Sequence, residues 1–243
     1  KLNNRIDFSY EHNYKYRSGK GKLTFEIKNS ALGSEYDYNL FSLKAVNSST
    51  KGKLKIKTRS YFQFGSGTNW APESKLFLAG ANPENLMGNK YTRASGFFPN
   101  DWMGYDNTTN FFHAGGGLNL RGYAGYLAPE SDDNGMITNF GYNGTSGASF
   151  STEVDFTKYM PYEFRAFGIT YYAFADAGVI TNEKLNKNNL KNAFYDLRAD
   201  AGFGLAYSFN SWGPLAMVKP ITIRFDMPLF LNRPPATNDD FLQ

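Results

Sequence analysis

The sequence predicts an all-β, antiparallel fold of the transmembrane β-barrel type, and three observations lead to this fold class. Apolar and polar residues alternate with a period of two along most of the chain, as they do in strands with one apolar and one polar face. Connections between the later segments alternate between short and long, which is typical of outer-membrane barrels. The composition is also unusual for a soluble domain, because 17% of the 243 residues are aromatic and 24 are glycine.

About eight strands are expected, and each rests on its own alternation of apolar and polar residues. They are placed at residues 6–10, 23–27, 36–40, 54–62, 150–156, 164–180, 199–210 and 220–230. The fourth strand carries a basic column on its polar face, formed by Lys53, Lys55, Lys57 and Arg59. Such a column is a solvated face, either on a soluble sandwich or in the wet lumen of a large barrel. A short helix is expected within a loop at 183–197.

The connections divide the chain into three parts. Segments 160–163 and 211–214 are expected to be tight turns, whereas 181–198 and 231–240 are long and polar. The longest insertion covers 65–145, and a segment of that length without regular structure is either functional or contains strands that the pattern does not reveal. We therefore expect barrel strands at 1–64, a long loop at 65–145, and C-terminal barrel strands at 146–243, with the closing strand missing.

Several classes of function find no support in the composition or motifs. Cysteine is absent, which removes disulfides and thiolate chemistry, and the net charge of +4 comes without a run of like charges, so no nucleic-acid partner is expected. The two histidines, His12 and His113, lie outside any zinc-peptidase motif, and no serine-hydrolase motif occurs. Residues 132–135 resemble the start of a calcium loop but lack its glutamate. We expect no catalytic residues, no cofactor and no metal.

One short motif stands within the insertion, where Leu120, Arg121, Gly122 and Tyr123 follow a run of three glycines. Neither the dinucleotide nor the Walker spacing of glycines is met. The motif instead resembles the arginine-glycine-aromatic signature of the BamA-type outer-membrane protein assembly superfamily, the bacterial surface antigen family. In that superfamily the signature lies at the tip of a long extracellular loop that folds back into the barrel lumen. The resemblance continues through segments 147–153, 174–179, 201–205, 212–215 and 223–229.

The resemblance implies a luminal latch. Glu153 and Asp176 match the family's inward-facing acidic positions, and both lie on the polar faces of successive expected strands. The guanidinium of Arg121 is a planar, permanently charged fork that needs carboxylate partners, so we expect it to pair with Glu153, Asp176 or both. Gly122 permits a turn that a side chain would obstruct, and Tyr123 can pack while its hydroxyl finds a partner.

The fold and function implied by the resemblance are those of the C-terminal half of an outer-membrane barrel in a Gram-negative bacterium. It would mediate the insertion, assembly or translocation of proteins. Its partners would be the lipid bilayer, unfolded or nascent outer-membrane proteins or a passenger protein, and accessory lipoproteins. One alternative is a barrel that anchors an upstream zinc aminopeptidase-like or patatin-like enzyme, and another is a soluble β-sandwich that binds a ligand. The aromatic segment 94–105 has no assigned role.

Overall fold

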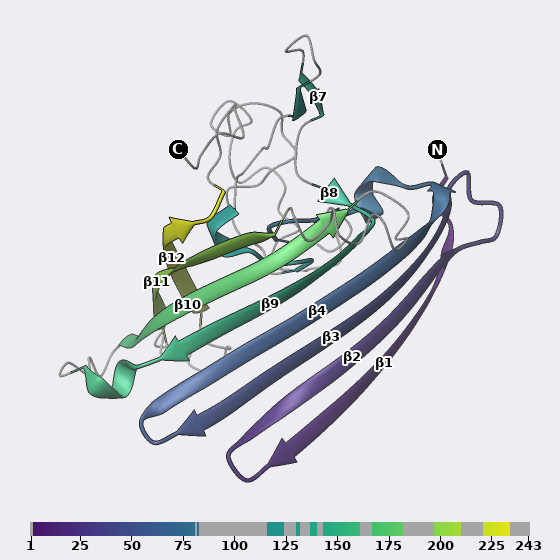
Figure 1. Ribbon diagram of the computed structural model, residues 1–243. Coiled ribbons are helices and arrows are strands. Elements are labelled where there is room, and N and C mark those ends of the chain that lie inside the picture. The colour runs from purple at the N-terminus through teal and green to yellow at the C-terminus, as the bar shows by residue number, and fades with distance from the viewer. Residues whose placement is uncertain are drawn as a thin grey trace.

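The fold is known from a computed structural model that describes residues 2–80, 82, 116–123, 130–131, 137–139, 143–160, 167–181, 197–209 and 221–233. One eight-stranded sheet dominates, in the order β1-β2-β3-β4-β9-β10-β11-β12, and every neighbouring pair is antiparallel (Figure 1). The all-β, antiparallel fold class and the eight expected strands are confirmed. The strands are β1 (Arg5–Tyr16), β2 (Gly19–Ser30), β3 (Asp37–Lys51), β4 (Leu54–Asn69), β9 (Ser146–Asp155), β10 (Phe167–Thr181), β11 (Arg198–Phe209) and β12 (Ile221–Leu231).

Shorter elements belong to the insertion or to a connection. Two small antiparallel pairs join β5 (Leu76–Phe77) to β8 (Asn143–Gly144) and β6 (Glu130–Ser131) to β7 (Ile137–Asn139). The 3-10 turns described are η1 (Pro72–Ser74), η3 (Arg121–Tyr123) and η4 (Thr157–Tyr159). No helix among the described residues is long and apolar enough to cross a membrane.

Several expected boundaries differ from those observed. β4 continues to Asn69, past the expected end of the first part at residue 64, because Gly65 and Gly67 let β4 pair closely with β3 and the start of β9. The turns expected at 160–163 and 211–214 lie outside the described residues, apart from Met160. The expected helix at 183–197 and the segment 94–105 lie outside the described residues, apart from Leu197.

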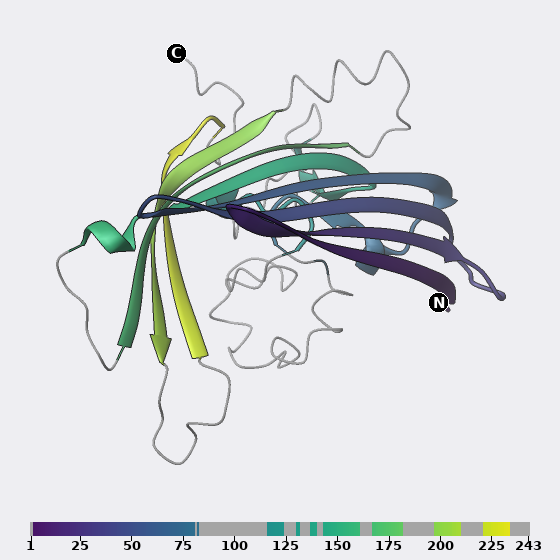
Figure 2. The ribbon, with the colours of Figure 1, turned by 90° about the horizontal axis from the view of Figure 1, so that it is seen from below.

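The sheet is bent into an arc with two unlike faces (Figure 2). We call the concave face, which contacts η3, the inner face, and it carries most of the charged side chains. Large apolar side chains are exposed on the opposite, outer face, where Phe8 is 58% and Phe225 63% exposed. Others exposed there are Ile6, Leu23, Ile27, Phe62, Phe64, Phe150, Phe203, Ile223 and Met227. The outer face is thus apolar in patches from one edge of the sheet to the other.

Aromatic rings on the outer face cross the first four strands in a row. Phe8, Phe25, Phe41 and Phe62 make successive edge-to-face contacts, with ring centroids 6.5, 5.1 and 6.2 Å apart. Cross-strand aromatic pairs of this kind stabilise a particular register. The row therefore helps to fix the pairing of β1 to β4.

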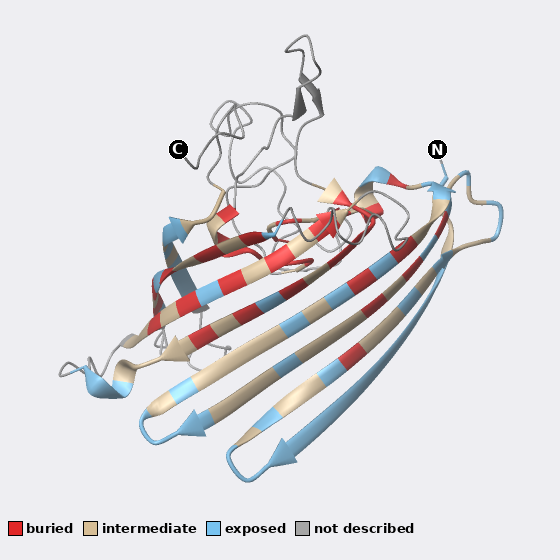
Figure 3. Ribbon diagram, in the orientation of Figure 1, coloured by how far each residue is buried: buried red, intermediate tan, exposed pale blue. Residues whose placement is uncertain are grey.

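The buried core lies against the inner face, beneath the described part of the insertion. Its members are contributed by the insertion and by β10: Leu76, Leu78, Leu118, Leu120, Tyr123 and Ile180. Buried positions accordingly concentrate on β9 to β11 and at the upper ends of β3 and β4 (Figure 3). Because apolar burial is the main favourable term in folding, this core holds residues 118–123 to the wall.

Candidate functional site

The approach to η3 is a tight turn anchored to the inner face. Gly117 and Asn119 both have positive φ, at 52° and 62°, a conformation that glycine and asparagine tolerate best. The Arg59 guanidinium donates to the carbonyl oxygens of Gly117 and Leu118, and the Ser149 hydroxyl donates to the Leu118 oxygen over 2.7 Å. These bonds hold the turn against β4 and β9, so that the next residues point into the inner wall.

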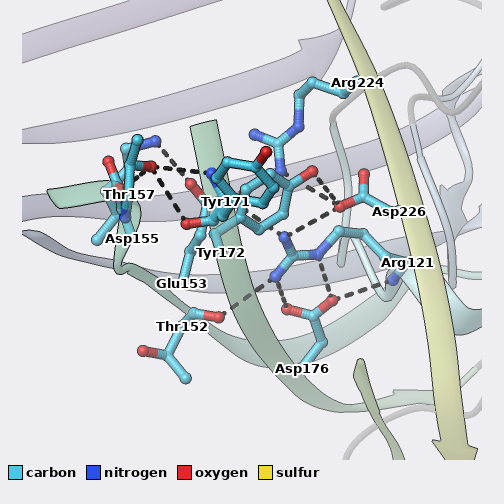
Figure 4. Close-up of polar contacts among 11 residues, drawn as sticks. Arg121, Thr152, Glu153, Asp155, Thr157, Tyr171, Tyr172, Asp176, Arg224 and Asp226 are labelled. Atoms are coloured by element: carbon cyan, nitrogen blue, oxygen red, sulfur yellow. Dashed lines mark hydrogen bonds and ion pairs between the residues drawn. The ribbon is translucent and has the colours of Figure 1, made fainter. Parts of the chain in front are cut away.

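Arg121 forms a two-pronged contact with Asp176 on β10. Its Nε lies 2.8 Å from Oδ2 and its Nη2 lies 2.8 Å from Oδ1, while its backbone N–H also donates to Oδ2 over 3.2 Å (Figure 4). The side chain of Asp176 is fully buried and that of Arg121 is 7% exposed. Parallel N–H···O bonds between a guanidinium and a carboxylate combine charge with geometric specificity. Asp176 is therefore the main seat of Arg121.

Arg121 makes three further contacts with the wall. Its Nη1 lies 3.3 Å from Glu153 Oε2, and its Nη2 donates to the Thr152 carbonyl oxygen over 3.3 Å. The guanidinium carbon lies 4.1 Å from the centroid of the Phe174 ring, within the range of a cation–π contact. Burial alone would lower the pKa of the Arg121 guanidinium, but the hydrogen bond to Asp176 and the nearby carboxylates raise that pKa above its ordinary value.

Glu153 is shared among three cations. Lys57, directly opposite on β4, lies 2.6 Å from Oε1, while Arg224 of β12 donates to Oε2 over 2.8 Å. The latter bond crosses the inner face from β12 to β9, past the two strands between them. Lys57 and Arg224 both have side chains 41% exposed, so Glu153 keeps partially hydrated partners besides Arg121.

Asp226 extends the network along β12. It accepts a hydrogen bond from the Tyr172 hydroxyl over 2.7 Å, lies 3.4 Å from Arg224, and lies 3.8 Å from Arg121. The Asp226 carboxylate therefore lies between Arg224 of β12 and Arg121 of the loop, and it interacts with both. Strands β9, β10 and β12 all contribute side chains to this network. The nearby residue of β11, Asp200, has no hydrogen bond to it.

Gly122 packs directly on Asp200. A Cβ built on Gly122 would lie 2.6 Å from the Asp200 Cβ, closer than real Cβ atoms come to another heavy atom. Only glycine therefore fits at this position of the motif, for steric reasons rather than for its φ. The following residue, Tyr123, is 1% exposed, and its hydroxyl donates to the Asn232 side chain over 2.8 Å. Residues 121–123 thus contact β9, β10, β11 and the end of β12.

All the site residues predicted from the sequence lie together. The structure brings Arg121 to both Glu153 and Asp176, and it buries Leu120 and Tyr123 beside them. The sequence analysis did not assign several neighbours to the site, among them Lys57, Phe174, Asp200, Arg224 and Asp226. The alternation of apolar and polar residues placed Lys57, Arg224 and Asp226 on polar faces, and this was the only sequence signal for their role. Nothing in the sequence indicated that the sheet curves enough to bring them to Arg121 and Glu153. Among the described residues, no group of acidic or histidine side chains is arranged to hold a metal ion.

Comparisons with known proteins add a likeness to solved structures. No protein-family model matches the chain, and no curated protein matches it. The structure is similar to a solved one described as "The crystal structure of BamA from Haemophilus ducreyi lacking POTRA domains 1-3". The identity is 18% and the TM-score 0.46, over 92% of this chain and 38% of that one. The chain thus spans well under half of the matched structure, and we infer function from its own residues.

Proposed function

We propose that the chain forms part of the wall of a bacterial outer-membrane β-barrel that mediates the insertion, assembly or translocation of proteins. In this proposal Arg121 latches the long loop to the inner wall. We define the luminal latch as Arg121 with its partners Asp176 and Glu153. The lipid bilayer would contact the outer face, and unfolded or nascent outer-membrane proteins would be the substrates.

The two faces of the sheet support a membrane location. Phenylalanine, leucine and isoleucine side chains are exposed on the outer face, while the inner face carries lysine, arginine and carboxylates. Leaving apolar area in water costs about 25 cal/mol per Å², whereas hydrocarbon removes that cost. A barrel wall with an apolar outside and a polar inside meets both conditions.

The buried latch is the observation that carries the functional proposal. A buried ion pair is a poor source of stability, because removing two charges from water offsets much of their attraction. A network of six charged side chains around one loop tip is therefore better explained by positioning than by stability: Lys57, Arg121, Glu153, Asp176, Arg224 and Asp226. A loop fixed in the lumen can control access to the interior of the barrel, and that is the role we assign to it.

The proposal is tested in cells that depend on the intact protein. We expect the protein in the outer-membrane fraction, with heat-modifiable mobility on gels, because a closed barrel resists unfolding in detergent. An Arg121→Ala variant should reach the membrane at normal levels yet fail to support insertion or secretion of its client proteins. Lys22→Ala, which alters an exposed inner-face pair, is the matched control. Normal client assembly with Arg121→Ala would refute the assigned role.

A further inference from the structure

We propose that Asp200 is a positioning residue for the latch: in its protonated form it donates a hydrogen bond to Asp176, which holds Asp176 in line with the Arg121 fork. This inference rests on the luminal latch of the proposed function. It adds a residue that the motif does not contain, and it makes the seating of the loop depend on pH.

The register of β10 and β11 brings the two carboxyl groups together. Asp176 and Asp200 are direct partners across the ladder, and both point to the inner face. Directly opposed residues have Cβ atoms roughly 4.5–5.5 Å apart, within reach of a hydrogen bond between two short carboxyl side chains after a small rotation. Each residue is 2% exposed, so neither carboxyl group is hydrated by bulk solvent.

The two carboxyl groups differ in their partners. Both oxygens of Asp176 accept hydrogen bonds from Arg121, whereas both oxygens of Asp200 are buried without a hydrogen-bond partner among the described residues. A carboxylate oxygen has two lone pairs, so Asp176 can accept another bond while it holds Arg121. A protonated Asp200 is the donor that this arrangement lacks.

The charges around Asp200 favour its neutral form. Asp176 faces it from β10, and the carboxylate of Asp226 lies on β12 opposite Gly204, four β11 positions further along. Arg121 of η3 is occupied by Asp176 and Glu153, and Arg224 by Glu153 and Asp226. Arg198, on the same face of β11, has its own contacts, and none of its bonds goes to the Asp200 oxygens; Tyr123 donates to Asn232. Arg121 and the Gly122 backbone favour a charged Asp200 to a lesser degree, but burial and the charge of Asp176 oppose a second negative charge at this position.

A proton is also the cation that fits the available space. Gly122 covers Asp200 so closely that a methyl group cannot be inserted between them. When Asp200 loses its proton to solvent, its carboxylate repels Asp176 and competes for Arg121. The latch is therefore held while Asp200 keeps its proton, and it weakens as the pH rises and Asp200 ionises.

A single cysteine can report the seating of the loop, because the chain contains none. Ser149 is 7% exposed beneath the Leu118 carbonyl, so Ser149→Cys is shielded from maleimide while residues 118–123 are seated. Labelling of the intact protein in detergent is compared between Asp200 and Asp200→Asn backgrounds at each pH. Ser18→Cys, in the exposed turn between β1 and β2, corrects for thiol reactivity.

We expect equal labelling of the two backgrounds at about pH 6, because Asn is neutral and can donate to Asp176. By about pH 9 the Asp200 background should label about tenfold faster than the Asn background, because the ionised Asp200 carboxylate repels Asp176 and weakens its contact with Arg121. Equal labelling of the two backgrounds across the whole range would overturn the proposal. So would an alkaline increase of the same size in Asp200→Asn.

An infrared spectrum provides an independent readout. The protein at about pH 6 should show the carbonyl stretch of a buried protonated carboxylic acid, and Asp200→Asn should remove it; a spectrum that Asp200→Asn leaves unchanged would contradict the assignment. Failure of the wider proposal has a different signature. If Arg121→Ala labels rapidly at every pH but supports normal client assembly, the proposed function fails while the role of Asp200 stands.

Discussion

The two halves of the sheet have different inner faces. On β1 to β3 the charges are largely hydrated, and the Lys22–Glu11 pair, at 2.5 Å, has side chains 42% and 51% exposed, whereas Lys57 and Arg59 of β4 reach the site. On β9 to β12 the charged groups converge on Glu153 and Asp176, whose side chains are 9% and 0% exposed. The same strand pattern thus supports a solvated surface in one half and a buried network in the other.

The difference lies in what covers each face. The insertion places Leu118, Leu120 and Tyr123 against β9 and β10, and this removes water from the charges beneath. Register in the first half depends instead on the row of phenylalanines on the outer face. Ionic contacts should therefore matter greatly in the second half and little in the first.

The largest expected effect is that of Arg121→Ala. It leaves Asp176 buried and without its cation, which costs on the order of 3 to 5 kcal/mol in a dry site and less where water enters the lumen. We expect rapid labelling at Ser149→Cys while circular dichroism shows the strands intact. Arg121→Lys should restore protection only in part, because an ammonium group cannot reproduce the two-pronged contact. Full protection in Arg121→Ala would show that the core alone seats the loop.

Next in size is the contrast between the two carboxylates of the latch. Asp176→Asn should expose the loop far more than Glu153→Gln, since Asp176 receives both prongs of Arg121 in a fully buried position. Loss of the Glu153 charge leaves Lys57 and Arg224 partially hydrated, at 41% exposure each. The comparison is made by hydrogen exchange of residues 116–123. Equal exchange in the two variants would argue against Asp176 as the main seat.

A smaller effect is expected for Gly122→Ala. The added methyl group meets the Asp200 Cβ, and overpacking of this kind typically costs about 1–3 kcal/mol. The matched test is the double variant Gly122→Ala with Asp200→Gly, which removes the colliding atoms. Thermal unfolding in detergent should show a lower midpoint for the single variant than for the double variant, after correction for Asp200→Gly alone. Equal destabilisation in both would locate the strain elsewhere.

The smallest effect should come from Lys22→Ala in the first half of the sheet. Exposed ion pairs contribute about 0–1 kcal/mol, and salt screens them. Loop protection and unfolding midpoint should both stay within error of the parent protein at physiological salt. A change comparable to that of Arg121→Ala would mean that the two inner faces are coupled.

Much of the fold was predictable because strand alternation is a local property. The face that carries Glu153 and the face that carries Asp176 followed directly from the residues on either side of them. Curvature is not local, and it is curvature that brings Arg224 from β12 to Glu153 on β9. Asp200 was missed because it stands just before the glycine-rich part of its strand and because its significance comes from its partner across the ladder.

The bond between Arg224 and Glu153 gives the wall a mechanical property. It joins two strands that are not neighbours, so its length depends on the radius of the arc rather than on any single strand ladder. Glu153 uses the same carboxylate oxygen, Oε2, to accept from Arg224 and from Arg121. Flattening the wall would pull Arg224 away and leave that oxygen to Arg121 alone, whereas tighter bending would increase the competition for it. The shape of the wall and the grip on the loop are thereby linked through one atom.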